Sequence, residues 1–373
     1  MKILHIMWEE KFKKTIAEFY DVHFNNGEHE ICYLNKPGHS SLIEKDYTIP
    51  QKELMDRGTF GDAMRLITEC KKYDYVAIHS YKIGVFASLL FLLDSSLRKK
   101  LVWIEWGFDL YEKKPEKGSI KNRIKYLVKH AVKGSVPYVV GIFPPDCDYY
   151  KSQYPKSKAV VCYAPYCGAK VDDEFLHYTR DCQLQKTRQD NDTVYIQIGH
   201  YALNRLNHIE VLKSLEKWKD ENIMLFLPLS YGNAAYADEV QQYAETMFPG
   251  KTIVLRKMMP KEDYFRLTQR IDIAVFNTTR QCGLSNIHRL IFRNVKLYMD
   301  ESSVMYRFFK GSGVPVQSYQ LLKNQDFEEF TAPVETTEAE KFADYLRFLS
   351  DSAYRMNFWK NIYDQLRNDL QNV

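Results

Sequence analysis

Residues 193–215 read TVYIQIGHYALNRLNHIEVLKSL, and this stretch decides the fold class of the chain. A short apolar strand runs into Gly199 and His200, a turn rich in Asn and Arg follows, and a helix with one apolar face comes next. A strand that stops at a glycine just before a helix places backbone N–H groups where an anion can bind. The segment also fits an ordinary strand–helix unit in which the glycine only closes the turn.

The stretch lies midway along a chain whose two halves both alternate strands with helices. In the first half we expect strands at 2–7, 29–34, 75–79, 100–105, 138–143 and 159–163, and helices at 52–71, 83–93, 118–133 and 147–154. In the second half we expect strands at 194–198, 224–228, 252–255, 273–276, 296–299 and 314–317, and a largely helical segment at 338–372. This alternation predicts parallel sheets covered by helices.

The length of the chain predicts two domains. A single hydrophobic core seldom grows beyond ~250–300 residues, and this chain has 373. Residues 164–192 show little periodicity and contain Pro165 and Gly168, so we place the linker there and expect domains at 1–175 and 176–373. The expected fold class is α/β, with two Rossmann-like domains facing across a cleft. Ligands of such sheets bind at the carboxyl ends of the strands, which makes the cleft the expected active site.

The composition is that of an ordinary globular protein. The net charge of +4 is too small to indicate a nucleic-acid partner. Seven scattered cysteines form no CxxC pair and fit reduced, cytoplasmic thiols. We expect no signal peptide, because a strand begins at once, and the longest apolar run (VFASLLFLL, 85–93) is far shorter than the ~20 residues that span a bilayer.

Polar residues follow one strand of the first half in the segment WGFDLYE, residues 106–112. Asp109 and Glu112 would lie near the carboxyl edge of the sheet, where a carboxylate within ~3 Å of a sugar hydroxyl can act as general base. Asp109 also fits the N-cap of a helix. His79 and His5 are further candidates for this site, and each also fits a core histidine.

Residues 113–133 combine charge with an apolar stripe. They contain eight Lys or Arg against one Glu, and the stripe consists of Ile120, Ile124, Leu127, Val128 and Ala131. Such a helix can lie on an anionic membrane or receive a lipid diphosphate. It equally fits a surface helix that packs its apolar face on the core. The candidate contacts to an acceptor or membrane are His5, Trp106, Lys113, Lys121 and Arg123.

Three turns of the second half could hold a nucleotide. They are the loop at 228–233, the segment 256–263 and the turn at 276–286, where a cation, small hydroxyls and a glycine precede a helix. These are the groups that hold a diphosphate at a helix N-terminus. Two Asp-x-Asp triplets, 146–148 and 190–192, fit solvated turns. We therefore expect neither a metal nor another cofactor.

Taken together, these segments resemble one family. WGFDLYE, IGHYALNRLNHIEVL, LPLSYGNAAYADEV and PKEDYFRLTQRIDIAVFNTTRQCGLSNI are similar, in the same order, to segments of the bacterial 4-acetamido-4,6-dideoxygalactose (4-N-acetylfucosamine) transferases. These enzymes build enterobacterial common antigen on a polyprenyl-diphosphate carrier. The likeness covers roughly residues 75–290, and His5 and His79 also look matched.

The resemblance implies a GT-B glycosyltransferase with an N-terminal acceptor domain and a C-terminal donor domain. It implies metal-independent, inverting transfer of a fucosamine-like sugar from a nucleoside-diphosphate donor, dTDP in the first instance, to a glycan or lipid-linked glycan. It also implies a cytoplasmic protein that is peripheral on the inner face of the plasma membrane. It makes Asp109 the candidate base, and the donor contacts that it implies are Gly199, Asn204, Tyr231, Arg280, Gln281 and Gly283. The turns themselves add further candidate donor contacts, namely His200, Arg205, Arg256, Ser285 and Asn286.

Two turns depart from the family pattern. The family's G-N-S-G-D-R-S-N-like turn is GHYALNRLN here (199–207), and its Q-x-G-x-G-T-like turn is QCGLSN (281–286), without the second glycine. These departures leave the deoxysugar and the acceptor open. Two other functions fit the same architecture. A non-catalytic nucleotide-sugar-binding subunit would bind nucleotide without transfer, and a nucleotide-sugar epimerase would need acidic residues around the sugar.

Overall fold

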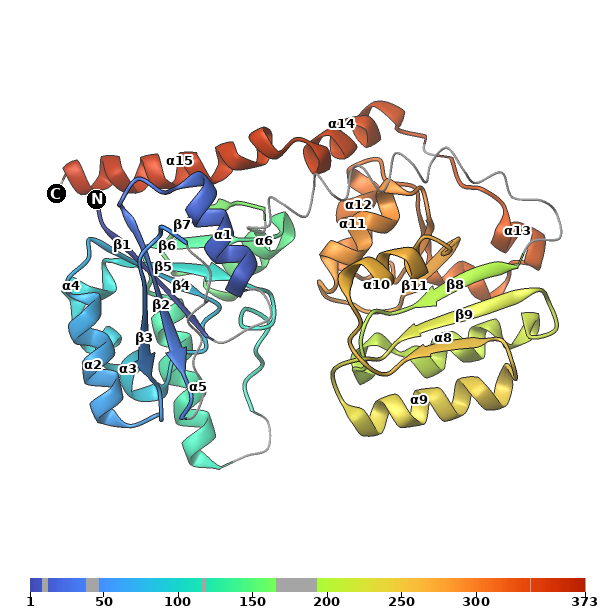
Figure 1. The fold of residues 1–373 in the computed structure, drawn as a ribbon, viewed down its shortest axis with the longest axis horizontal. Coiled ribbons are helices and arrows are strands. Elements are labelled where there is room, and N and C mark those ends of the chain that lie inside the picture. The colour runs from blue at the N-terminus through green and yellow to red at the C-terminus, as the bar shows by residue number, and fades with distance from the viewer. Residues whose placement is uncertain (9–12, 38–46, 116–118, 166–192, 336, 373) are drawn as a thin grey trace. The chain divides into compact units, whose positions relative to one another are not determined.

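The computed structural model describes residues 1–8, 13–37, 47–115, 119–165, 193–335 and 337–372 (Figure 1). It divides into two compact units. Unit 1 comprises Met1–Asp172 and Ser352–Val373, and unit 2 comprises Asp173–Asp351. Each unit contains one parallel sheet covered by helices, as the alternation of the sequence predicts.

Unit 1 has a seven-stranded sheet in the order β3-β2-β1-β4-β5-β6-β7. Its strands are β1 (Ile3–Trp8), β2 (His29–Asn35), β3 (Gln51–Met55), β4 (Tyr75–His79), β5 (Leu101–Glu105), β6 (Tyr138–Gly141) and β7 (Val160–Tyr163). Its helices are α1 (Lys13–His23), α2 (Phe60–Cys70), α3 (Val85–Leu93), α4 (Ser95–Arg98), α5 (Ile120–Lys133), α6 (Pro144–Gln153) and α15 (Ser352–Gln371). The order of the strands reverses between β1 and β4, which is where ligands of such sheets usually bind.

Both faces of this sheet are buried, because its strands are apolar throughout. Trp103 of β5 packs into a core shared with α2 to α6, whereas its neighbours Val102 and Ile104 pack into a core shared with α1 and α15. Figure 1 shows α2, α3 and α5 on one side of the sheet and α1 with α15 on the other. Strands with two buried faces are typical of parallel sheets.

The sequence prediction lacks α1 and α4, and it assigns one segment wrongly. The single helix expected over 52–71 is wrong, because the structure has β3 and then α2. Strand β3 pairs in parallel with β2 from Ile31 opposite Gln51 to Asn35 opposite Met55. The helix starts only after Gly58, whose φ is +74°, and Thr59, whose side chain caps it. Pairing with a neighbouring strand here overrides a local pattern that lacks strand character.

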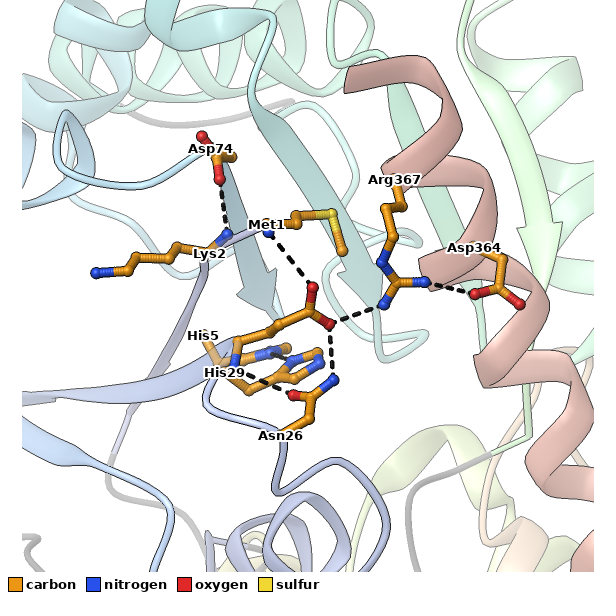
Figure 2. Close-up of polar contacts among 9 residues, drawn as sticks. Met1, Lys2, His5, Asn26, His29, Asp74, Asp364 and Arg367 are labelled. Atoms are coloured by element: carbon orange, nitrogen blue, oxygen red, sulfur yellow. Dashed lines mark hydrogen bonds and ion pairs between the residues drawn. The ribbon is translucent and has the colours of Figure 1, made fainter. Parts of the chain in front are cut away.

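The long helix α15 belongs to unit 1, although the sequence analysis places the closing helices in the second domain. Its apolar side packs into the core of α1 and the sheet. The indole Nε1 of Trp359 donates a hydrogen bond to the carbonyl of Pro165 (2.8 Å), and the hydroxyls of Tyr20 and Tyr363 are 2.7 Å apart. Arg367 reaches the carboxylate of Glu28 at 2.8 Å (Figure 2). Unit 1 is therefore completed by a segment that follows unit 2 in the sequence.

Unit 2 has a six-stranded sheet in the order β10-β9-β8-β11-β12-β13. Its strands are β8 (Val194–Ile198), β9 (Ile223–Pro228), β10 (Thr252–Leu255), β11 (Ile273–Phe276), β12 (Lys296–Met299) and β13 (Val316–Ser318). Its α-helices are α8 (His208–Leu215), α9 (Ala234–Met247), α10 (Lys261–Thr268), α11 (Leu284–Phe292), α12 (Val304–Gly311), α13 (Phe327–Thr331) and α14 (Ala339–Ser350). The strand order reverses between β8 and β11. The first stretch quoted from the sequence thus opens this unit, as expected.

No helix in the described parts of the chain combines the length and apolar character needed to cross a membrane. The most apolar helix, α3, has nine residues.

Removal of the Trp359 side chain tests whether α15 completes unit 1. This indole is 1% exposed, and Trp359→Ala should lower the free energy of unfolding by about 3–5 kcal/mol, because it leaves a cavity in the core. Denaturant unfolding can be followed by fluorescence in a Trp218→Phe background, since the other four tryptophans lie in unit 1. Tyr354→Ala, on the exposed side of the same helix, should change the stability by only about 0.5 kcal/mol. Equal losses in the two variants would contradict this packing.

Candidate functional site

The loops that follow β8 and β9 meet at the carboxyl edge of the sheet of unit 2. Ala202 donates its N–H to the carbonyl of Tyr231 (2.9 Å), and Asn233 donates its N–H to the carbonyl of Ala202 (2.7 Å). Gly232 lies between these contacts with φ +112°, and a Cβ there would be 2.2 Å from the carbonyl oxygen of Ala202. The two loops can approach this closely only because residue 232 has no side chain.

The turns that follow β8 and β11 also meet. The ring of His200 lies against Gly283, where a Cβ would be 2.9 Å from the ring. Gly283 has φ +58°, in the left-handed region that favours glycine. The amide of Asn207 donates a hydrogen bond to the carbonyl of Asn277 (3.0 Å). The structure therefore brings together the turns at both sides of the strand-order reversal.

The N-terminus of α8 is not the open anion site that the sequence suggests. A short 3₁₀ turn (Asn204–Leu206) separates it from Gly199. The first N–H of the helix, that of His208, donates to the hydroxyl of Tyr236 (3.1 Å). The buried ring of His208 packs so close to Gly199 that a Cβ there would be 2.5 Å from Nε2. Gly199 is needed for this packing.

The N-terminus of α11 offers a better anion site. No side chain caps α11 at Gly283, whereas Asn233 caps α9 and Ser303 caps α12. Burial raises the pKa of the adjacent Cys282 thiol to about 12, and the positive charges of Arg205 and Arg280 act in the opposite direction. Arg280 lies on the turn that leads into α11, and the charge of Arg205 acts on the same thiol. Two cations and an uncapped helix N-terminus are the elements of a diphosphate site.

The structure separates the other candidate donor contacts into three groups. Tyr231 stacks on Tyr201 with ring centroids 5.1 Å apart, and Arg205 donates to the hydroxyl of Tyr201 (2.6 Å). Arg256 instead contacts α9, where it pairs with Asp238 (2.6 Å). The remaining group lies on the turns beside the N-terminus of α11 or in its first turn, and it consists of His200, Asn204, Gln281, Gly283, Ser285 and Asn286.

In unit 1 the buried carboxylate of Asp109 joins the loops that follow β4 and β5. Its Oδ2 accepts the N–H of Tyr81 (2.6 Å) and the indole N–H of Trp103 (2.7 Å), and its Oδ1 accepts the N–H of Trp106 (2.8 Å). Three of the four acceptor positions of the carboxylate are thereby used. Asp109 is built into the loop structure at the expected edge of the sheet.

Glu112 differs from Asp109 in its access to solvent. Its side chain is 43% exposed and pairs through Oε2 with the buried ammonium of Lys133 at 3.0 Å. The same ammonium donates to the carbonyl of Asp109 (2.6 Å). Trp106 and Lys113 flank this segment, Trp106 half-buried and Lys113 exposed. Lys133 therefore fixes the whole segment 106–112 to the end of α5.

Two further carboxyl groups, of Glu105 and Asp146, contact this loop, and the sequence prediction leaves out the first and places the second in a solvated turn. Glu105 is fully buried and accepts the N–H of Gly107 (2.6 Å) and of Ile142 (3.1 Å). Burial raises its pKa well above the usual range, and the charges of Asp146 and Asp109 raise it further. Asp146 is also fully buried and accepts the hydroxyl of Tyr111 (2.7 Å).

The expectation of solvated turn carboxylates is thus wrong for Asp146, because it lies in the first turn of α6, is fully buried and accepts a hydrogen bond from Tyr111. It holds for Asp148, whose side chain is 84% exposed. The triplet 190–192 and most of the linker at 164–192 lie outside the described residues. A charged residue at the end of an apolar strand, as in LVWIE, is the sequence signal that points to Glu105.

Three histidines form a hydrogen-bonded chain across unit 1. His5 Nδ1 lies 3.1 Å from His79 Nε2, and His5 Nε2 lies 2.9 Å from His29 Nδ1 (Figure 2 shows His5 and His29). All three rings are buried. Burial lowers the pKa of His29 to about 4 and that of His79 to about 3, and it holds the pKa of His5 well below its usual value. His29 is a member that the sequence does not reveal.

Comparison with known proteins gives one family and one fold. Residues 44–349 match the model of a family described as 4-alpha-L-fucosyltransferase, glycosyl transferase group 56. The Anabaena protein HepE in complex with UDP is 11% identical over 99% of this chain and 100% of its own, with a TM-score of 0.65. Sucrose-phosphate synthase from Thermosynechococcus elongatus is 9% identical over 99% of this chain and 100% of its own, with a TM-score of 0.67. The architecture is the GT-B glycosyltransferase fold, as expected from the sequence.

The buried histidines make unit 1 sensitive to acid. The unfolded chain takes up protons near pH 6.5, whereas folded His79 and His29 do so only near pH 3 and 4, so protonation favours unfolding. We expect the free energy of unfolding to fall below pH 6.5 by about 1.4 kcal/mol per pH unit for each such histidine. Denaturant unfolding at pH 7, 6 and 5 measures this slope. His79→Gln should make the slope shallower, and an unchanged slope would contradict the assignment.

Proposed function

Because the chain belongs to the 4-alpha-L-fucosyltransferase family, glycosyl transferase group 56, we propose that it transfers a fucosamine-like deoxy- or amino-sugar to a glycan acceptor. The family model matches well over half of the chain, in agreement with the resemblance seen in the sequence. The chain is a glycosyltransferase. The donor nucleotide, the stereochemistry and the acceptor are the parts that we propose.

The donor is a nucleoside-diphosphate sugar bound by unit 2. The observation that carries this proposal is the uncapped N-terminus of α11, with Arg280 on the turn that leads into it and the charge of Arg205 acting on the adjacent Cys282. HepE, which has the same fold, has been solved with UDP-glucose, and this supports a nucleotide sugar here. The stacked pair of Tyr201 and Tyr231 offers a flat aromatic surface of the kind on which a nucleobase stacks. We take dTDP as the first donor to test.

The leaving nucleoside diphosphate needs positive charge, and the site supplies it from the protein. Two arginines and a helix dipole stabilise the charge that develops on the departing phosphate. The reaction is then independent of a metal ion. The acceptor oxygen forms its bond to the anomeric carbon as the bond to the diphosphate breaks, and this single displacement inverts the anomeric configuration.

Glu112 is the best-placed group to take the proton of the acceptor hydroxyl. A general base must reach the hydroxyl within ~3 Å, and Glu112 is the exposed carboxylate among the three candidates. Asp109 is occupied by three N–H donors, and His79 is buried against His5. We therefore assign Asp109 to positioning the loop that follows β5, and His79 to positioning the loop that follows β4. Trp106 and Lys113 then flank the acceptor.

The acceptor is a glycan carried on a polyprenyl diphosphate, presented at the inner face of the plasma membrane. The family resemblance motivates this assignment, and the basic segment 113–133 next to Glu112 supports it by offering cations to a lipid diphosphate. Lys121 and Arg123 are the residues assigned to the membrane surface.

The proposed function is tested by incubating the protein with dTDP-, UDP- and GDP-linked deoxysugars and a lipid-linked glycan, with and without EDTA. Transfer from one donor, unaffected by EDTA, with inverted configuration in the NMR spectrum of the product, is the expected result. Binding of nucleotide without transfer would indicate a binding subunit. Conversion of the donor without acceptor would indicate an epimerase. A requirement for a divalent cation would contradict the charge assignment.

Arg280→Gln should weaken the binding of a nucleoside diphosphate by about tenfold to a hundredfold, because it removes a charge-assisted hydrogen bond worth about 1.5–3 kcal/mol. Titration calorimetry with dTDP measures the loss. Arg307→Gln, at an exposed position of α12, is the matched control and should bind like the parent protein. Equal affinity in all three proteins would remove Arg280 from the donor site.

Glu112→Gln should reduce turnover by about 10²–10⁴-fold with unchanged nucleotide affinity, because it removes a general base but no donor contact. Asp148→Asn, also an exposed carboxylate of unit 1, should leave turnover unchanged. Asp109→Asn should instead lower the thermal stability, since it disturbs three buried hydrogen bonds. Full turnover in Glu112→Gln together with loss of turnover in a folded Asp109→Asn protein would reassign the base to Asp109.

A further inference from the structure

Unit 1 exposes large apolar side chains on three neighbouring helices. They have exposed fractions between 39% and 77%, and they are Phe60 and Met64 of α2, Phe86, Leu89 and Leu93 of α3, and Ile120, Ile124 and Leu127 of α5. We call these eight residues the apolar face. Single exposed apolar residues are ordinary, but a contiguous patch indicates an interaction site.

The eight residues share one side of the unit. Helix α3 contacts both α2 and α5, and all three helices pack their inner sides on the same core (Figure 1). Their outer sides therefore face away from the sheet together. Phe60 and Phe86 are in contact across two helices, with ring centroids 6.0 Å apart. The sequence leaves open whether the stripe of α5 is buried, and the structure exposes all of it except Val128, which is half-buried.

Helix α5 projects from the unit at its N-terminal end. All six residues from 120 to 125 are exposed, so the rest of the unit covers little of this end of the helix. The spacing of Ile120, Ile124 and Leu127 places them on one side of the helix. A helix end with one apolar side and no groove around it suits insertion into a soft, flat layer better than docking against a shaped protein surface.

Cations border the apolar face, and the helices α3 and α5 contain no Asp or Glu. Lys121, Arg123 and Lys125 are exposed on α5. The two carboxylates of α2, Asp62 and Glu69, are both neutralised, by Arg57 and by Lys52. Apolar side chains flanked by lysine and arginine are complementary to the acyl chains and anionic headgroups of a bilayer.

The apolar face also reaches the edge of the sheet where the acceptor is proposed to bind. Phe86 and Ala87 line a hollow together with Leu34 and Leu54, which lie near the carboxyl ends of β2 and β3. Glu112 lies beyond the carboxyl end of β5, and Lys133 at the end of α5 holds it. A surface that binds the apolar face would therefore lie close to the proposed acceptor site of unit 1.

We propose that unit 1 docks on an anionic lipid bilayer through the apolar face, with Ile120, Ile124 and Leu127 entering the headgroup region and Lys121, Arg123 and Lys125 contacting anionic headgroups. The proposal rests on the proposed function in that a bilayer carries the lipid-linked acceptor. It assigns the membrane contact to helices α2, α3 and α5 together.

Vesicle co-sedimentation tests the proposal with the full chain. The protein should sediment with vesicles of phosphatidylcholine and 30% phosphatidylglycerol at low salt and much less with pure phosphatidylcholine. Ile124→Ser with Leu127→Ser, and separately Lys121→Glu with Lys125→Glu, should each weaken binding by about tenfold or more. The matched controls lie on α1 and α15, on the other side of the sheet, namely Val22→Ser with Leu370→Ser, and Lys14→Glu with Lys360→Glu, and they should bind like the parent protein.

The outcomes separate this proposal from the proposed function. Vesicle binding needs no donor or acceptor, so it can succeed even if no transfer is found. With a short, water-soluble acceptor, the Ile124→Ser, Leu127→Ser protein should keep the parent turnover, and with acceptor in vesicles it should lose most of it. Parent-like vesicle binding by both face variants would overturn the proposal. So would a failure of the parent to bind, or a dimer that the apolar substitutions convert to a monomer.

Discussion

One buried carboxylate organises the carboxyl edge of the sheet of unit 1. Asp109 accepts hydrogen bonds from an N–H of the loop after β4, from the indole of β5 and from the start of its own loop. Each of these donors would cost about 1–3 kcal/mol if it were buried without a partner. The carboxylate therefore stabilises Ser80 at φ +62° and Gly107 at φ +76°, both sharp turns beside a strand end. Through Lys133 it also connects this edge to α5.

In unit 2 the loops at the carboxyl edge of the sheet are held close together by residues that have no side chain. Gly232 and Gly283 let loops from different strands approach within contact distance, where any Cβ would collide with Ala202 or His200. Arg205 of one turn and Arg280 of another both act through their charge on Cys282, the residue before the N-cap of α11. Unit 1 thus holds its loops by a charge, and unit 2 holds its loops by glycine. The proposed acceptor site thus lies on the loops held by a charge, and the proposed donor site lies on the loops held by glycine.

The sequence predicts the regular parts of the fold well, because they depend on local patterns. Apolar runs such as 75–79 and 273–276 lie between turn residues and can only be buried strands. Strand β3 is different, since QKELM has no strand pattern of its own and depends on its pairing with β2. Asp146 reads as a turn residue but lies under Tyr111. In unit 2, the candidate turns could be predicted because they follow strand ends. The hydrogen bond from the first N–H of α8 to Tyr236 could not be predicted, because Tyr236 belongs to a later helix.

The position of α15 has a consequence for how the protein is made. Tyr20 and Tyr363 touch although 343 positions separate them, and the core around α1 needs Trp359 and Leu366. During synthesis unit 2 is contiguous and can fold as soon as it emerges, whereas unit 1 has to wait with one side of its sheet covered only in part, by α1. Contacts this distant form late. A ribosome-bound chain that has not reached α15 would thus present a finished unit 2 together with an incompletely covered, aggregation-prone sheet, which is the stage at which a chaperone would be needed.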